Sequence, residues 1–173
     1  MELHMNIFLI GPRACGKTRI GRLLANSLGA EFVDTDHFFV DMVGMEIAPY
    51  VERYGWEGFR EMETEALASV STGGRRVIGC GGGIVLRESN RAILASGVAV
   101  YLKTAPEVLV HRLQRDPHEA QRPSLTGHSV VDEVASVLSE RAALYEGCAD
   151  IIAPEGEPDD IVKFIKREIL LLS

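Results

Sequence analysis

The chain has 173 residues, of which 46% are hydrophobic and 25% charged, with a net charge of −7 and a pI near 5.3. This length suits one α/β domain and is short for two. The acidic balance argues against general binding to nucleic acids or anionic membranes. The sequence has no apolar run of about 18 residues, no signal-peptide pattern at its start, and three cysteines without metal-ligand spacing. We therefore expect a cytoplasmic monomer with reduced thiols, binding neither nucleic acid nor membrane.

Strand and helix patterns alternate along the chain, without a long linker, a repeat or a low-complexity segment. The first strand is the apolar run at 7–10, and apolar residues at helical spacing predict a helix at 18–28. A second strand follows at 31–33. The alternation favours a parallel sheet covered by helices on both faces. Further helices are expected at about 37–43, 47–53, 57–70, 88–95, 106–115, 130–146 and 159–171, and further strands at 76–80, 98–102 and 150–153.

Residues 11–18 fit the pattern G-x-x-x-x-G-K-[ST] at every fixed position, between the first strand and the first helix. Gly11 and Gly16 let the backbone curl so that successive N–H groups point at one anion, and the helix N-terminus adds partial positive charge. The pattern predicts that Lys17 reaches the β- and γ-phosphates and that the Thr18 hydroxyl binds Mg²⁺. The alternative is a glycine-rich turn without a ligand.

Two carboxylates, Asp34 and Asp36, follow the second strand. A phosphate loop needs a second acidic contact to Mg²⁺, and the third strand ends in glycines without an Asp. Active sites in open α/β sheets lie at the carboxyl ends of strands. We therefore expect one of the two to face the metal and the other an acceptor hydroxyl. The alternative is that Asp36 serves only as a helix N-cap.

The glycines at 81–83 end the third strand at the same edge of the sheet. They would leave room for a ligand beside exposed backbone N–H groups, or they form only a tight turn. In the preceding helix, Arg60 falls on an otherwise apolar stripe with Glu63 three residues later. A buried charge is costly unless paired, so the two are expected to pair and to present a carboxylate clamp, or to be a plain structural ion pair.

Further arginines could face a ligand. Arg141 lies on an apolar helical face, or else is exposed at its edge. Arg122 falls in the polar stretch 116–129, which we expect to be a mobile loop, where it could close over the phosphates. Arg112 and Arg115 could stack on a base or steady that loop. For Arg122, Arg112 and Arg115 the alternative is an ordinary solvated surface charge.

Together these motifs resemble shikimate kinase, in the nucleoside-monophosphate-kinase-like branch of P-loop proteins. The resemblance covers nearly the whole chain, and the type II subgroup is the most similar. The order and spacing of the motifs are far more specific than the phosphate loop alone. They comprise residues 11–18, Asp34-Thr35-Asp36, Gly58-Phe59-Arg60 with Glu63, Gly81-Gly82-Gly83, Arg122-Pro123 and Arg141-Ala142-Ala143-Leu144-Tyr145.

The resemblance implies a three-layer P-loop kinase fold over 1–173, with a five-stranded parallel sheet of order 2-3-1-4-5, a shikimate-binding subregion at about 34–62 and a mobile lid at about 114–129. It implies Mg²⁺-dependent transfer of a phosphoryl group from ATP to the 3-hydroxyl of shikimate, in aromatic amino-acid synthesis, with ADP as the other product.

The resemblance also implies roles for individual residues. Asp36 would contact the acceptor hydroxyl as the base, while Thr18 and Asp34 would hold Mg²⁺, Asp34 through water. The implied catalytic residues are Lys17, Asp36 and Arg122. The implied shikimate contacts are Asp36, Arg60, Gly81, Gly82 and Arg141. The implied ATP contacts are Gly11, Pro12, Arg13, Ala14, Cys15, Gly16, Lys17, Thr18, Arg19, Arg112 and Arg122.

The chain departs from the family pattern at two places. Its last strand runs into Ala153-Pro154-Glu155 where Asp-Thr or Asp-Ala is frequent, which leaves the adenine contacts open. Ser124 replaces a frequent Leu or Thr in the lid, a change expected to be harmless.

Other functions compete with this one. A related kinase of another small acid, such as gluconate, would also use arginines aimed at a carboxylate. A non-catalytic nucleotide-binding regulator is a different class, but the Asn-Lys-x-Asp motif of guanine switches is absent. A mononucleotide acceptor would need a base pocket, and the sequence shows none.

Cys15 lies inside the phosphate loop and Cys80 ends the third strand, so both thiols are expected near the site. Cys15 also lies at a helix N-terminus beside Lys17, which favours the thiolate. The alternative is an inert thiol buried under the loop.

Overall fold

The computed structural model describes residues 5–115, 124, 127 and 129–172. Most of the expected lid, including Arg122, lies outside the described residues. None of the helices in the described part combines the length and apolar character needed to cross a membrane.

Five parallel strands form one sheet in the order β2-β3-β1-β4-β5, which confirms the expected topology. β1 and β4 are buried along their whole length, as expected for parallel strands covered on both faces. The short β1 and β3 pair in register from Ile7 opposite Val77. The strands are β1 (Ile7–Ile10), β2 (Glu31–Asp34), β3 (Arg76–Gly79), β4 (Val98–Leu102) and β5 (Ile151–Ala153).

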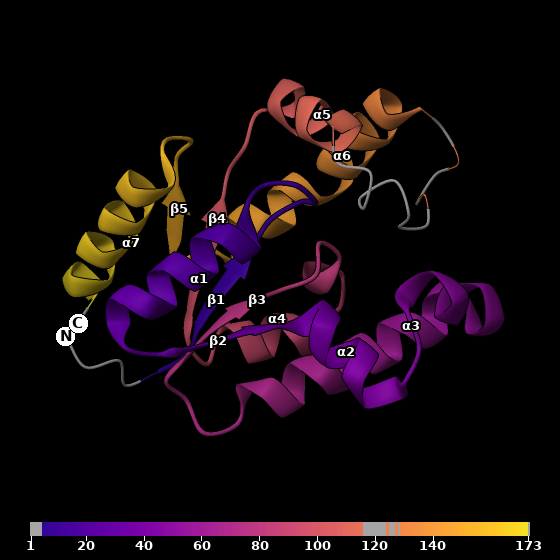
Figure 1. Cartoon of the computed structure of the whole chain (residues 1–173), viewed down its shortest axis with the longest axis horizontal. Coiled ribbons are helices and arrows are strands. Elements are labelled where there is room, and N and C mark those ends of the chain that lie inside the picture. Colours follow the sequence, from indigo (N-terminus) through magenta and orange to yellow (C-terminus); the bar gives the residue numbers. More distant parts are fainter. Residues whose placement is uncertain (1–4, 116–123, 125–126, 128, 173) are drawn as a thin grey trace.

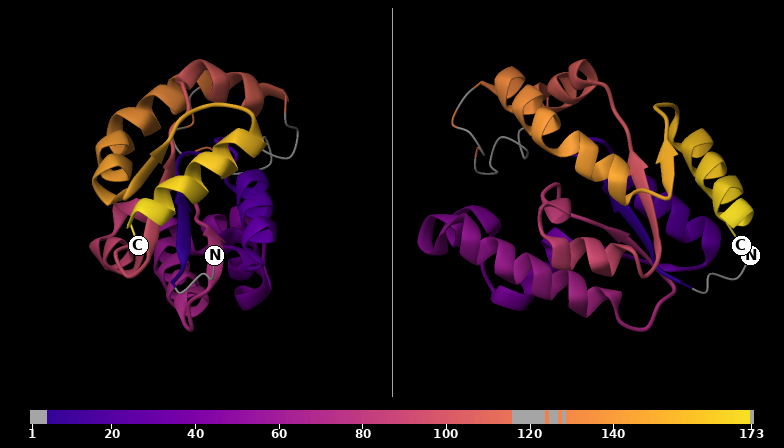
Figure 2. Two further views of the ribbon diagram at one scale, coloured as in Figure 1. Left: turned by 90° about the vertical axis from the view of Figure 1, so that its left-hand side faces the viewer. Right: turned by 180° about the vertical axis from the view of Figure 1, so that it is seen from behind.

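Helices cover both faces of the sheet (Figures 1 and 2). On one face, α1 (Lys17–Leu28) and α7 (Pro158–Leu172) lie side by side and bury residues such as Leu24 and Ile165. On the other, α3 (Ile47–Ser71), α4 (Glu88–Leu94) and the C-terminal part of α6 (Val130–Cys148) enclose a second core. The N-terminal part of α6 packs against α5 (Pro106–Arg115) beyond the carboxyl ends of the strands (Figure 1).

The helix α2 (Thr35–Val43) packs against α3 in a separate aromatic cluster. The ring of Phe39 meets the rings of Tyr50 and Phe59 edge-on, each at a centroid distance of 5.1 Å. Aromatic pairs of this geometry stabilise beyond their buried area. The cluster fixes the first half of α3, and with it Arg60, relative to the sheet.

The expected elements are present, with ends that differ by one or two residues. The helices expected at 47–53 and 57–70 form one continuous span, broken by non-helical backbone at Gly55 (φ 75°, ψ 170°). That conformation suits glycine, which explains why the helical pattern is interrupted there. A short 3₁₀ helix, η1 (Ile84–Leu86), was not predicted, because three residues are too few to show a periodicity.

Close packing of α1 on β2 predicts that Gly21→Ala is destabilising. A Cβ at Gly21 would lie 2.2 Å from a ring carbon of Phe32. Overpacking of this kind costs about 1–3 kcal/mol, more than alanine gains as a helix former. Urea unfolding should show that loss. The matched control is Gly147→Ala in α6, where nothing lies within 4 Å and stability should rise by up to about 1 kcal/mol. Equal effects of the two substitutions would contradict this account.

Candidate active site

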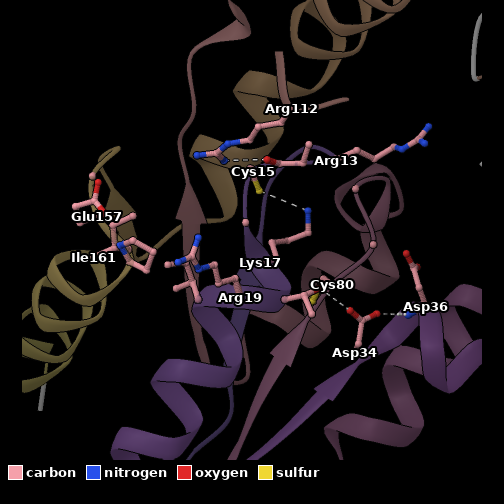
Figure 3. A pocket seen from close by; sticks show the side chains of 18 residues that line it. Arg13, Cys15, Lys17, Arg19, Asp34, Asp36, Cys80, Arg112, Glu157 and Ile161 are labelled. Carbon is pink, nitrogen blue, oxygen red and sulfur yellow. Dashed lines mark hydrogen bonds between the residues drawn. The ribbon is translucent and has the colours of Figure 1, made fainter. Parts of the chain in front are cut away.

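A cavity of about 560 Å³ lies at the carboxyl ends of the strands, between the phosphate loop, the β2 and β3 ends, and α7 (Figure 3). A second and smaller one, of about 60 Å³, continues from it between α3 and α6. Of the expected ATP contacts, residues 13–19 and Arg112 line the larger cavity, whereas Gly11 and Pro12 do not. The smaller one is lined by Arg60, Arg141 and the three glycines after β3.

The phosphate loop is held in shape by its own lysine. Lys17 Nζ donates to the carbonyl oxygens of Gly11 and Pro12, both at 2.7 Å. Gly11 and Gly16 have φ of 144° and 102°, which glycine adopts readily. Ala14 also has a positive φ, 63°, which costs an L-residue about 1–2 kcal/mol. Its carbonyl accepts a hydrogen bond from Arg112 Nη1 at 2.9 Å, so α5 braces the loop at its strained residue (Figure 3).

Asp34 joins the loop to α2. Its Oδ2 accepts from the Thr18 hydroxyl at 3.0 Å, and its Oδ1 accepts from the amides of Asp36 and His37 at 2.9 and 3.4 Å. Asp34, and not Asp36, is thus the N-cap of α2. The cap leaves the Asp36 carboxylate on the first helical turn, lining both cavities. A hydroxyl and a carboxylate side by side suit Mg²⁺, which takes few protein ligands and keeps several waters. The described residues contain no cluster of three or more His, Cys, Asp or Glu that could bind a metal by themselves.

The glycines after β3 make room for charged side chains. A Cβ at Gly81 would lie 2.7 Å from Glu63 Oε2 and 2.9 Å from Asp36 Oδ1, and one at Gly83 would lie 2.2 Å from Arg60 Nη1. The Gly81 amide donates to the Thr35 hydroxyl at 3.0 Å, so this N–H is already engaged. These glycines therefore let charged side chains approach the backbone closely, and the Gly81 amide is not available to a ligand.

Arg60 and Glu63 pair as the helical spacing predicted, with Arg60 Nη1 donating to Glu63 Oε1 at 2.7 Å. The guanidinium also lies over the rings of Trp56 and Phe59. Glu63 is only 3% exposed. Burial raises the pKa of the Glu63 carboxyl, and the adjacent Arg60 opposes that rise.

Arg141 is buried, so the alternative of an exposed arginine at the helix edge is wrong. Its Nε is a buried donor without a hydrogen-bond partner in the described structure. One turn further along α6, the Tyr145 hydroxyl donates to the Gly82 carbonyl and joins the helix to the glycine turn. Arg60 and Arg141, far apart in sequence, line the same small cavity with Asp36.

The wall of the larger cavity at the end of β5 was not identified from the sequence. It is formed by residues 156–158 and Ile161, with Arg19 and Arg112 lining the same cavity (Figure 3). Ile161 belongs to the helix expected at 159–171, and nothing in its apolar periodicity marks a residue at the rim of a cavity. Arg115 does not line this cavity, and the predicted role of Arg122 falls outside the described residues.

Comparison with known proteins agrees with this geometry. The sequence model of the family Shikimate kinase matches residues 13–170. The chain belongs to the shikimate kinase family. Shikimate kinase 2 of Enterobacter sp. (strain 638) is 46% identical over 167 residues, 95% of each chain, and that of Dickeya chrysanthemi is 48% identical over 153 residues, 88% of each. Shikimate kinase activity, that of an ATP-dependent small-molecule kinase, follows from this membership.

Solved structures support the same assignment. Shikimate kinase from Acinetobacter baumannii in complex with shikimate has a TM-score of 0.89 and 34% identity, covering 98% of this chain and 94% of that one. A gluconokinase from Sinorhizobium meliloti 1021 reaches a TM-score of 0.61 at 15% identity, which shows a shared fold alone.

The positions of the thiols predict site-selective alkylation. Cys15 and Cys80 both line the larger cavity. Both thiols are buried, Cys15 at 6% and Cys80 at 2% exposure, and burial raises the pKa of the Cys80 thiol well above its usual range. Cys15 Sγ lies 3.6 Å from Lys17 Nζ. We expect N-ethylmaleimide to inactivate the enzyme slowly through Cys15, with protection by ATP and Mg²⁺.

Mass mapping of the alkylated protein checks this. The half-buried Cys148 should be labelled without loss of activity, and Cys80 should stay unlabelled until unfolding. Labelling at Cys148 alone, or inactivation indifferent to ATP, would mean that Cys15 is inert.

Proposed function

We propose that this protein transfers the γ-phosphoryl group of ATP to the 3-hydroxyl of shikimate, giving ADP and shikimate 3-phosphate for aromatic amino-acid biosynthesis. One observation supports this most strongly. The Asp36 carboxylate lines both cavities, one built on a phosphate loop and the other on two arginines. The phosphoryl donor and a small carboxylate-bearing acceptor would therefore meet at a base.

The larger cavity would bind the nucleotide. The loop backbone and Lys17 would cradle the phosphates, with the amides at the start of α1 adding partial positive charge. Arg19, Arg112 and residues 156–158 would flank the adenine and ribose, because they form the part of the cavity remote from Asp36. Lys17 would exchange its bonds to two loop carbonyls for bonds to phosphate oxygens.

Mg²⁺ would be held by the Thr18 hydroxyl directly and by Asp34 through water. When bound, the ion neutralises charge on the phosphate oxygens. The double use of Asp34 supports this role, because capping fixes its Oδ1 and leaves Oδ2 turned toward Thr18.

The smaller cavity would bind shikimate, with Arg60 and Arg141 on the carboxylate. Glu63 holds Arg60 in one orientation, and the unpartnered Nε of Arg141 would gain an acceptor on binding. The ring would lie against Trp56, Phe59 and the glycine turn. Asp36 would then accept the proton of the hydroxyl as it attacks phosphorus.

We further propose that 1–173 is one kinase domain, with its acceptor subregion at about 34–62, and that it works as a monomer in the cytoplasm. Both cavities are formed by a single chain, and its three cysteines are free.

A coupled ADP-release assay tests the activity. Shikimate, gluconate and nucleoside monophosphates are compared in parallel, with the Lys17→Ala protein as the blank. We expect turnover with shikimate alone, abolished by EDTA and restored by Mg²⁺. Preferred turnover of gluconate would favour the related small-acid kinase.

Arg141→Ala should raise KM for shikimate far more than KM for ATP, because it removes a charge-assisted contact of about 1.5–3 kcal/mol. Arg60→Ala should act likewise and also lower the melting temperature, since it leaves Glu63 buried without its partner. Lysine at either position should rescue poorly, because the bidentate geometry is lost. Equal losses of ATP affinity would place these residues on the nucleotide side.

Asp36→Asn should lower kcat by about 10²–10⁴-fold with little change in ATP affinity, because the amide cannot accept the hydroxyl proton. Asp34→Asn should instead raise the Mg²⁺ concentration needed for half-maximal rate. Steady-state kinetics across a Mg²⁺ titration separates the two. Exchanged phenotypes would mean that the two roles are the reverse of those proposed.

A further inference from the structure

Arg13, the third residue of the phosphate loop, lies where the two cavities join. Of the described residues, four line both cavities, and only Arg13 and Asp36 among them contribute side chains, the others being Gly81 and Gly82. A Cβ at Gly82 would lie 3.6 Å from the Arg13 nitrogen and 3.9 Å from its Cγ, so Arg13 passes directly over this glycine. In Figure 3 its side chain points away from Cys15 and Arg112. The loop motif does not specify this residue, yet it lines both cavities together with the proposed base.

Glu133, in the first turn of α6, contacts Arg13. Arg13 Nη1 lies 3.7 Å from Glu133 Oε1, and the two side chains are only 20% and 16% exposed. The other oxygen, Glu133 Oε2, accepts from the Ser124 hydroxyl. That hydroxyl in turn accepts from the amide of Gly127 at 2.8 Å. One carboxylate therefore links the phosphate loop, α6 and the stretch before α6.

We propose that Glu133 is a positioning residue that holds the Arg13 guanidinium at the junction of the cavities, with Ser124 fixing the carboxylate. The inference rests on the proposed phosphoryl transfer. During that transfer, charge is spread over the oxygens of the group that passes between the cavities. A cation already oriented there stabilises the charge without reorganising during the reaction. Arginine has a long, flexible stem, so its orientation depends on the carboxylate that pairs with it.

The proposal gives Ser124 a role at the position where relatives frequently have Leu or Thr. Leucine could not donate to Glu133, and the carboxylate would lose the hydrogen bond from Ser124. The competing explanation is that Arg13 and Glu133 form an ion pair that only attaches α6 to the loop. In that case the pair would affect stability and leave kcat unchanged.

The test is a double-mutant cycle with Glu133→Gln and Arg13→Ala, plus Ser124→Ala. The matched control is Glu146→Gln, on the same helix, which removes an exposed ion pair with Lys103 remote from both cavities. For each variant, kcat, both KM values, the ADP dissociation constant without shikimate and the melting temperature are measured.

We expect Glu133→Gln and Arg13→Ala each to lower kcat about tenfold, and the double variant to be no slower than Arg13→Ala. Ser124→Ala should lower kcat about twofold to threefold, with no further effect when Glu133 is already Gln. The ADP dissociation constant should stay within twofold, and Arg13→Lys should recover part of the rate. Glu146→Gln should behave as wild type.

Wild-type kcat in Glu133→Gln, or effects that multiply independently in the double variant, would overturn the inference. So would a loss confined to the melting temperature. If Glu133→Gln does not fold, the same cycle is measured with Ser124→Ala and Arg13→Lys. Independent effects of these two substitutions on kcat would overturn the inference. Absence of shikimate turnover by the wild type would overturn the proposed function and this inference with it, whereas an active wild type with unaffected variants overturns the inference alone.

Discussion

The buried ion pair of Arg60 and Glu63 determines much of the structure around the smaller cavity. An uncompensated charge at Glu63 would be strongly destabilising, so the guanidinium must stay within hydrogen-bonding distance. Its position then leaves no room for a side chain at Gly83, and the Glu63 carboxylate leaves none at Gly81. Three features keep the Glu63 carboxylate away from water and the Arg60 guanidinium in place: the glycine turn, the aromatic residues beside Arg60, and the packing of α2 on α3.

A second constraint links the phosphate loop to α2 through Asp34. Its two oxygens are used in different directions, one to cap α2 and one to accept from Thr18. Capping determines where α2 begins, and Asp36, two residues after the cap, then lies at the junction of the cavities. The spacing Asp-x-Asp therefore follows from helix geometry: the first residue ends the strand and caps, and the second lies in the first helical turn.

The sequence predicted those parts of the fold and site in which a local pattern of residues is sufficient to determine the structure. The loop at 11–18, the strands and the pairing of Arg60 with Glu63 follow from motif, hydrophobicity and i,i+3 spacing, while the sheet order came from the family resemblance. Other features depend on contacts between distant segments. Nothing local marks Ala14 as left-handed, Ile161 as a cavity wall or Glu133 as the partner of a loop arginine. A cap at Asp36 was the alternative considered for that residue, whereas the structure shows that Asp34 caps α2 and accepts from the amides.

The cations at this site differ in how they are held, and this bears on selectivity. Arg60 and Arg13 each face a glutamate, and Lys17 is held by carbonyl oxygens, so their positions are set before any ligand arrives. Arg141 keeps one buried N–H unpaired in the described structure. An unsatisfied buried donor costs about 1–3 kcal/mol, which a ligand oxygen at that point would recover. A neutral sugar alcohol could not supply a charged acceptor there, whereas a carboxylate could. Under the proposed function, the smaller cavity would therefore favour an acid, through one unsatisfied donor and one fixed guanidinium.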